Sequence, residues 1–266
     1  GRVIAFGGRS MEPENPAKYL NSPETELFHK CHSLYNLANA RKPAHQAGSV
    51  VAVEGYMDVI ALAQAGIDHA VAPLGTALTP EQIALLWTMS AEPILCFDGD
   101  RAGQRAALRA AERCLPLLQP GKSLRFAILP EGLDPDDLLR RDGPKALEAV
   151  LDAAEPLSDL LWRRLITGKD IGTPERRAGL EQTVFNTLSQ ITDDKIRGFY
   201  IRDFKDRLYR LGRPIAAGRV AGRGGFSSQQ FQNRFGGGSK GRFQGGFRHQ
   251  GMAPGPASPQ LKASRL

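Results

Sequence analysis

The chain has 266 residues, 41% of them hydrophobic and 24% charged, which is enough for one sizeable core and a second, smaller one. No apolar run approaches the roughly 18 residues of a membrane-spanning helix. The three cysteines are odd in number and never form a C-x-x-C pair. We therefore expect a protein of the reducing cytoplasm, neither membrane-bound nor disulfide-rich. Because the chain opens on glycine within a strand-like run, we interpret it as a fragment of a longer protein.

The positive charge is concentrated at the carboxyl end. Residues 213–266 contain nine Lys or Arg and no Asp or Glu, so this segment has a net charge of +9. Because the whole chain has a net charge of +7, residues 1–212 have a net charge of −2. This tail also has twelve glycines and repeated Gly-Arg and Gly-Phe pairs, without aliphatic periodicity. We expect a disordered linker, with weak affinity for single-stranded nucleic acid as a by-product.

Residues 1–48 give the weakest pattern. A short strand is expected to run into the Gly7-Gly8 turn and a proline-rich loop, and a helix is expected over 25–42 because leucines recur at helical spacing.

Strands and helices alternate from Ser49 onwards. A helix beginning at Pro80 is indicated by Thr79 as N-cap, proline in the first turn and Gln82 completing a capping box. Strands joined by roughly ten-residue helices indicate right-handed crossovers and a parallel sheet, hence an α/β fold. The expected strands are 50–53, 69–74, 94–97 and 124–129, and the helices between them are 57–65, the one from residue 80 and 102–115.

After Asp134 the sequence predicts helices alone, which would form a small helical subdomain. These helices are expected at 136–141, 145–153, 157–166, 175–190 and 193–211. The expected domains are 1–48, a remnant of a preceding domain; 49–143, the α/β domain; 144–212, the helical subdomain; and 213–266, the tail.

Acidic residues follow three of the predicted strands. They are Glu54, the pair Asp98 and Asp100, and the pair Asp134 and Asp136. Because the carboxyl ends of parallel strands share one edge of a sheet, we expect all five carboxylates in one crevice. Such a concentration of negative charge is typical of a site for hard divalent cations such as Mg²⁺, and two ions could support in-line phosphoryl displacement.

Each acidic segment also has an ordinary interpretation. A single D-x-D after a strand is common, and Asp134 and Asp136 could equally cap the helix that follows them. Asp58 lies one helical turn beyond Glu54. The functional interpretation depends on the joint occurrence of the segments, in order, each at the end of a predicted strand.

These segments resemble the Toprim module of bacterial primases, topoisomerases and some nucleases. Longer strings resemble the catalytic core of the bacterial replicative primases in particular. They are EGYMDVIALAQAGI, APLGTALT, FDGDRAGQRAA and LPEGLDPDDLLRRDGP, with GRVIAFGGR and KYLNSPET upstream.

The resemblance implies a DNA-dependent RNA polymerase that makes short primers on single-stranded DNA from ribonucleoside triphosphates. It implies that Asp98, Asp100, Asp134 and Asp136 bind two or more Mg²⁺ or Mn²⁺ ions. It also implies that Glu54 is a metal-site acid or general base and that Asp58 supports the cluster. It also implies a basic segment for nucleotide and nucleic acid, matched here by Arg9, Lys18, Tyr19, Asn21 and Lys30.

The chain departs from the family at both ends. A zinc-binding domain and a carboxyl-terminal helicase-binding domain are expected only in parts missing from this chain, which we expect to be monomeric. Two alternatives stay open: another Toprim enzyme, such as a topoisomerase or nuclease, and a non-catalytic nucleic-acid-binding module. The second would be expected to lose carboxylates, and none of the five is lost.

Overall fold

The structure is a computed structural model and describes residues 3–10, 19–74 and 77–212. At its centre is a six-stranded sheet in the order β3-β5-β4-β6-β7-β8. The four inner strands are parallel, as predicted, and the two edge strands run antiparallel to their neighbours. The strands are β3 (Leu34–Tyr35), β4 (Val51–Ala52), β5 (Ala70–Pro73), β6 (Ile94–Phe97), β7 (Arg125–Ile128) and β8 (Glu155–Pro156).

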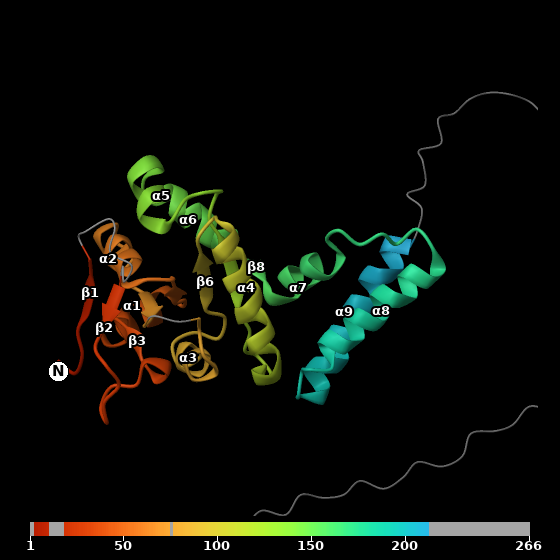
Figure 1. The fold of residues 1–266 in the computed structure, drawn as a ribbon, viewed down its shortest axis with the longest axis horizontal. Coiled ribbons are helices and arrows are strands. Elements are labelled where there is room, and N and C mark those ends of the chain that lie inside the picture. Colours follow the sequence, from red (N-terminus) through yellow and green to blue (C-terminus); the bar gives the residue numbers. More distant parts are fainter. Residues whose placement is uncertain (1–2, 11–18, 75–76, 213–266) are drawn as a thin grey trace, which may run out of the picture. The chain divides into compact units, whose positions relative to one another are not determined.

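Helices cover both faces of this sheet, and Figure 1 shows α4 beside β6. Buried residues of α2, α5 and α6 pack on one face, and those of α1, α3, α4 and α7 pack on the other. The α/β class predicted from the sequence is confirmed. The helices are α1 (Leu37–Ala47), α2 (Tyr56–Gln64), α3 (Pro80–Leu86), α4 (Arg101–Cys114), α5 (Pro135–Asp142), α6 (Pro144–Asp152), α7 (Leu157–Ile166), α8 (Pro174–Leu188) and α9 (Asp194–Gly212).

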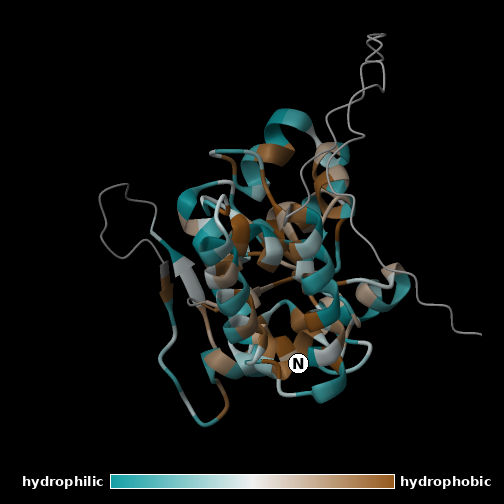
Figure 2. Cartoon of the chain, turned by 90° about the vertical axis from the view of Figure 1, so that its right-hand side faces the viewer, coloured by the Kyte–Doolittle hydropathy of each residue, from teal (hydrophilic) through white to brown (hydrophobic). Residues whose placement is uncertain are grey.

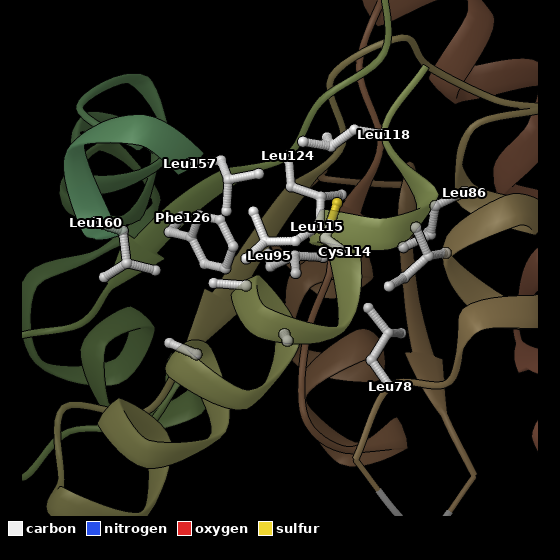
Figure 3. Packing of buried hydrophobic residues seen from close by; sticks show 14 of the residues in the cluster. Leu78, Leu86, Leu95, Cys114, Leu115, Leu118, Leu124, Phe126, Leu157 and Leu160 are labelled. Atoms are coloured by element: carbon white, nitrogen blue, oxygen red, sulfur yellow. The ribbon is translucent and has the colours of Figure 1, made fainter. Parts of the chain in front are cut away.

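The inner strands alternate between the two faces residue by residue. In β6, Leu95 and Phe97 join one hydrophobic cluster, whereas Ile94 and Cys96 join the other. Such buried strands are apolar throughout because each face meets a layer of helices. Figure 3 shows one of these layers, where side chains of α4, β7 and α7 point toward one another. Figure 2 shows that the helices carry both hydrophobic and hydrophilic residues along their length.

The capping box predicted for α3 is present. The Thr79 hydroxyl accepts a hydrogen bond from the Gln82 amide at 3.2 Å, and the Gln82 side chain accepts one from the Thr79 amide at 3.0 Å. The Gln82 side chain is almost fully buried and also donates to the backbone carbonyls of Lys30 and Ser33. This residue therefore fixes the segment preceding β3 to the start of α3.

The amino-terminal segment differs from the prediction. The strand β1 (Gly7–Arg9) includes both glycines and pairs with β2 (Tyr19–Asn21), which was predicted as loop. The helix predicted over 25–42 begins only at Leu37, preceded by a 3-10 turn, η1 (Lys30–His32), and by β3. Helix geometry is interrupted at Asn36, whose φ of 65° is left-handed.

The carboxyl-terminal segment adds one strand that was not predicted. β8 pairs antiparallel with β7, although only helices were expected after Asp134. Beyond α7, helices α8 and α9 pack against each other, and Leu180 and Phe204 join a hydrophobic cluster that also includes residues of α4 and α7. The predicted tail at 213–266 lies outside the described residues. Within the described part, no helix is both long and apolar enough to cross a membrane.

Candidate active site at the carboxyl edge of the sheet

Three neighbouring strands deliver acidic residues to one edge of the sheet, as predicted. Glu54 follows β4, Asp98 follows β6 directly, and Asp134 lies in the loop between β7 and α5. The loops after β6 and β7 touch at Gly99, whose amide donates to the Leu133 carbonyl at 3.0 Å. A Cβ atom at Gly99 would lie 1.8 Å from the Pro130 carbonyl oxygen, so only glycine permits this approach.

A cleft of about 510 Å³ opens at this edge. Four carboxylates line it, and so do side chains from the amino-terminal hairpin, from α2 and from α4. Cys96 and Phe97 lie beneath, where β6 ends. The polar and charged lining residues are Asn21, Glu54, Tyr56, Asp58, Asp98, Arg109 and Asp134.

Asp98 is the most perturbed of the carboxylates. Burial, followed by the negative charges of Glu54 and Asp58 and then of other acidic residues, raises the pKa of Asp98 to about 7. Its Oδ1 atom is buried and has no hydrogen-bond partner among the described residues. A buried carboxylate oxygen without a donor is costly, so this atom is well suited to receive a cation.

Asp58 and Glu54 share this electrostatic environment. Burial raises the pKa of Asp58 to about 6, against a hydrogen bond that its Oδ2 accepts from the Gly55 amide at 3.0 Å. Burial also raises the pKa of Glu54, although its side chain reaches solvent at the rim of the cleft. The Glu54 Oε1 atom accepts a hydrogen bond from the Asp98 amide at 3.1 Å, which joins the ends of β4 and β6.

The remaining predicted ligands take part in helix starts. Asp100 caps α4 by accepting from the Gly103 amide at 2.7 Å, and Asp134 caps α5 by accepting from the Asp137 amide at 2.7 Å. Asp136 forms an ion pair with Arg140. Of these three acidic residues, only Asp134 lines the cleft, but the charge of Asp100 still contributes to the raised pKa values of Glu54 and Asp98.

The residues of the expected basic segment are distributed over several places. Asn21 lines the cleft, whereas Arg9 lies on β1 opposite Tyr19 in the hairpin. Lys30 lies in the turn that packs against α3 and does not line the cleft. Lys18 lies outside the described residues, and the structure describes only the backbone of Tyr19.

Two of the polar and charged lining residues were not proposed from the sequence. Tyr56, at the start of α2, has its ring centroid 5.7 Å from that of Tyr35. Arg109 projects from α4, and its charge opposes the rise in the pKa of Glu54. No signal in the sequence singles out Arg109 among the arginines of α4, which recur at every fourth position.

The cleft residues fit a hard divalent cation. Carboxylate oxygens are the ligands that Mg²⁺ and Mn²⁺ prefer, and Asp98 offers a buried oxygen that lacks a donor. Within 3–10, 19–74 and 77–212, however, no group of three or more His, Cys, Asp or Glu is gathered closely enough to hold one ion. Binding of one ion by Glu54, Asp98 and Asp134 together would therefore require their side chains to move closer to one another.

The raised carboxyl pKa of Asp98 predicts how stability changes with pH in metal-free protein. Between the ordinary pKa and about 7, the folded state binds a proton that the unfolded state has released. This contribution to stability is complete below the ordinary pKa and is lost as the pH rises through about 7.

We expect the midpoint of urea unfolding to fall between about pH 5 and about pH 8 more steeply in the wild-type protein than in Asp98→Asn, which cannot titrate at this position. Urea titrations of both proteins with a chelator present would measure the difference. Parallel pH profiles would contradict the assignment of a raised pKa to Asp98.

Comparisons with known proteins identify the fold. The family model of the Toprim domain matches residues 48–127, the region that contains β4 to β7 and most of the cleft. The sheet and its acidic edge therefore define a Toprim-domain protein. Two further models match: the amino-terminal domain of the DNA primase catalytic core at residues 1–41, and the DnaB-helicase binding domain of primase at residues 158–209.

The whole-chain similarities agree. The DNA primase of Escherichia coli K12 is 45% identical over 208 residues, which are 78% of this chain and 36% of that protein. A solved DnaG catalytic core superimposes with a TM-score of 0.72 at 45% identity, covering 80% of this chain and 68% of that one. A DnaG catalytic domain bound to single-stranded DNA gives 0.70 at 45% identity, covering 77% and 66%. The chain belongs to the family of bacterial DNA primases.

The match at residues 158–209 differs from one expectation. The helicase-binding part was expected only beyond this chain, yet a model described by that activity matches α7, α8 and most of α9. These helices resemble the family in character and contain no distinctive motif, so this match could not be predicted from the sequence. The chain spans 36% of the length of the Escherichia coli relative.

Proposed function

We propose that this chain carries the catalytic centre of a primase, which synthesises short RNA primers on single-stranded DNA from ribonucleoside triphosphates. The observation that carries the proposal is the convergence of Glu54, Asp98 and Asp134 on one cleft at the ends of adjacent Toprim strands. The chain's relatives are named DNA primases, which favours primer synthesis over a topoisomerase or nuclease activity.

Divalent ions would be held by Asp98, Glu54 and Asp134, with Asp100 and Asp136 at the periphery. Two Mg²⁺ or Mn²⁺ ions, when bound, would supply the positive charge that stabilises the attacking and leaving oxygens of phosphoryl transfer. The hydrogen bond from the Asp98 amide orients the Glu54 carboxylate, which in our proposal holds a metal or accepts a proton. Asp58 supports the site by fixing the Gly55 amide at the start of α2.

The nucleotide would enter from the side of the amino-terminal hairpin. Asn21 lines the cleft there and offers an amide to a base or sugar, and Arg9 and Tyr19 lie on the same hairpin. In our proposal Lys18 and Lys30 contact nucleic acid.

Template-directed incorporation of labelled ribonucleotides tests the proposal. The assay uses single-stranded DNA with Mg²⁺ or Mn²⁺, in the full-length protein and in this 266-residue chain. RNA products complementary to the template support primer synthesis. DNA cleavage or relaxation without RNA products would favour the other Toprim enzymes, and DNA binding with neither reaction would favour the non-catalytic module.

We further propose that residues 158–209 contact the replicative helicase. The proposal is supported by the family match over these residues, which cover α7, α8 and most of α9. We assign 1–48, 49–143, 144–212 and 213–266 as the functional segments of a monomeric, cytoplasmic protein. Any zinc would belong to another part of the full-length protein.

The basic tail is expected to dominate non-specific binding to single-stranded DNA. Residues 213–266 carry +9, while residues 1–212 carry −2. If half of these cations contact phosphates, truncation after Gly212 should flatten the slope of log affinity against log salt by about 3, at roughly 0.7 per phosphate. Salt titrations of the two proteins would measure this change. An unchanged slope would assign the binding to the basic residues near Arg9 and Lys30.

A further inference from the structure

Helix α4 carries arginines at every fourth position, and they have different surroundings. They are Arg101, Arg105, Arg109 and Arg113. Arg113 has a structural role, because its Nη1 donates to the carbonyls of Ala77 at 3.2 Å and Leu78 at 2.8 Å. Arg101 and Arg105 are exposed and do not line the cleft. Only Arg109 combines an exposed side chain with a position in the cleft wall.

The helix geometry explains this difference. The core-facing positions of α4 include Gly103, Ala107 and Ala110, which are buried. Ala106 and Arg109 are three residues apart and therefore lie on one side of the helix, and both line the cleft. Ala106 has only a methyl side chain, so the guanidinium of Arg109 is the one polar group that α4 contributes to the described lining of the cleft.

The charge of Arg109 is unusual for its surroundings. Glu54, Asp58, Asp98 and Asp134 also line the cleft, and Arg109 is the only cationic side chain among its described lining residues. Its charge lowers the pKa of Glu54, against the effects of burial and Asp100. No hydrogen bond from its guanidinium to another described residue occurs, so its donors remain available to a ligand.

An anionic substrate needs such a group in an acidic cleft. The carboxylates repel phosphate, whereas a planar guanidinium can donate two parallel hydrogen bonds to phosphate oxygens. We infer that Arg109 binds a phosphate group of the incoming ribonucleoside triphosphate. The inference rests on the proposed function and adds a residue to its substrate site.

Nucleotide binding to the full chain tests the inference. The probes are ATP and AMP in the presence of Mg²⁺, with affinities measured by titration calorimetry for the wild-type protein, Arg109→Gln, Arg109→Lys and Arg105→Gln. Arg109→Gln should weaken ATP binding about tenfold, because a charge-assisted hydrogen bond is lost. It should weaken AMP binding less, because AMP has fewer phosphate groups. Arg109→Lys should recover part of the affinity, because the lysine ammonium keeps the positive charge but cannot donate two parallel hydrogen bonds as the guanidinium does. Arg105→Gln removes the same charge one helical turn earlier and should bind ATP like the wild type.

The outcomes separate the sources of phosphate. Wild-type ATP affinity in Arg109→Gln, with folding verified by circular dichroism, would overturn the inference. Normal ATP affinity with weakened binding of a single-stranded oligonucleotide would also overturn it, and would assign Arg109 to the nucleic-acid backbone. Equal losses of ATP and AMP affinity would support the inference and place the contact at the α-phosphate, which both nucleotides carry. If the wild-type chain and the full-length protein bound no ATP and made no RNA, the proposed function itself would fail, and the inference with it.

Discussion

Replacing Asp98 with asparagine is expected to reduce primer synthesis in the full-length protein at least ~100-fold. The amide keeps the size of the side chain but removes the charge that neutralises a bound cation. Asp98 has the strongest case among the carboxylates, because its Oδ1 is buried without a donor among the described residues and its pKa is raised to about 7. Initial rates of RNA synthesis across Mg²⁺ concentrations would measure the effect.

The folded state should tolerate this change. Removing a negative charge from a site where carboxylates repel one another should leave the stability equal or higher at neutral pH. Asp142→Asn is a suitable control, because Asp142 pairs with Arg141 at an exposed position that does not line the cleft. A near wild-type rate with an unchanged Mg²⁺ requirement in Asp98→Asn would show that this residue does not bind the metal.

Replacing Gly99 with alanine is expected to cause the largest loss of stability. The added methyl group would lie 1.8 Å from the Pro130 carbonyl oxygen and 2.5 Å from its carbonyl carbon. Because both atoms belong to the backbone, the loops after β6 and β7 would have to separate. We expect the free energy of unfolding to fall by about 3 kcal/mol or more.

A glycine in an open position provides the matched control for this change. Gly179 lies within α8, where an added Cβ would meet no atom within 4 Å. Gly179→Ala should raise the free energy of unfolding by about 0.5 to 1 kcal/mol, because alanine loses less backbone entropy in a helix. Urea unfolding of both variants would measure the contrast. Equal stability of Gly99→Ala and the wild type would show that the two loops do not meet at this position.

The central part of the fold could be predicted because local signals and tertiary packing agree there. The strand at 94–97 and the cap at Thr79 are found where the sequence predicts them. Between residues 25 and 36 the local signals and the tertiary packing disagree. The leucines repeat at helical spacing, but Leu34 is buried as part of a strand that pairs with Pro73, almost forty residues away. Such a pairing leaves no local signal, and the same is true of β8.

The site was predictable where the sheet itself places a residue. Glu54, Asp98 and Asp134 follow adjacent parallel strands, so topology alone brings them to one edge. Asp100 and Asp136 lie two residues beyond Asp98 and Asp134, where the chain enters the helices α4 and α5. The alternation of side chains along a strand therefore does not place them in the cleft. Arg109 comes from a helix whose rotation relative to the sheet is set by packing, and the spacing of its arginines does not reveal which one reaches the cleft.

The two short outer strands affect how the sheet meets other molecules. A long strand at the border of a sheet offers a row of unpaired amides to which a second chain can add. Here β3 and β8 have only two residues each, and β8 ends in Pro156, which has no amide hydrogen to donate. We expect little tendency toward edge-to-edge aggregation through this sheet. Exchanging Pro156 for a β-branched residue would restore one amide donor at this border but leave the strand short, so we expect light scattering of concentrated samples to change little.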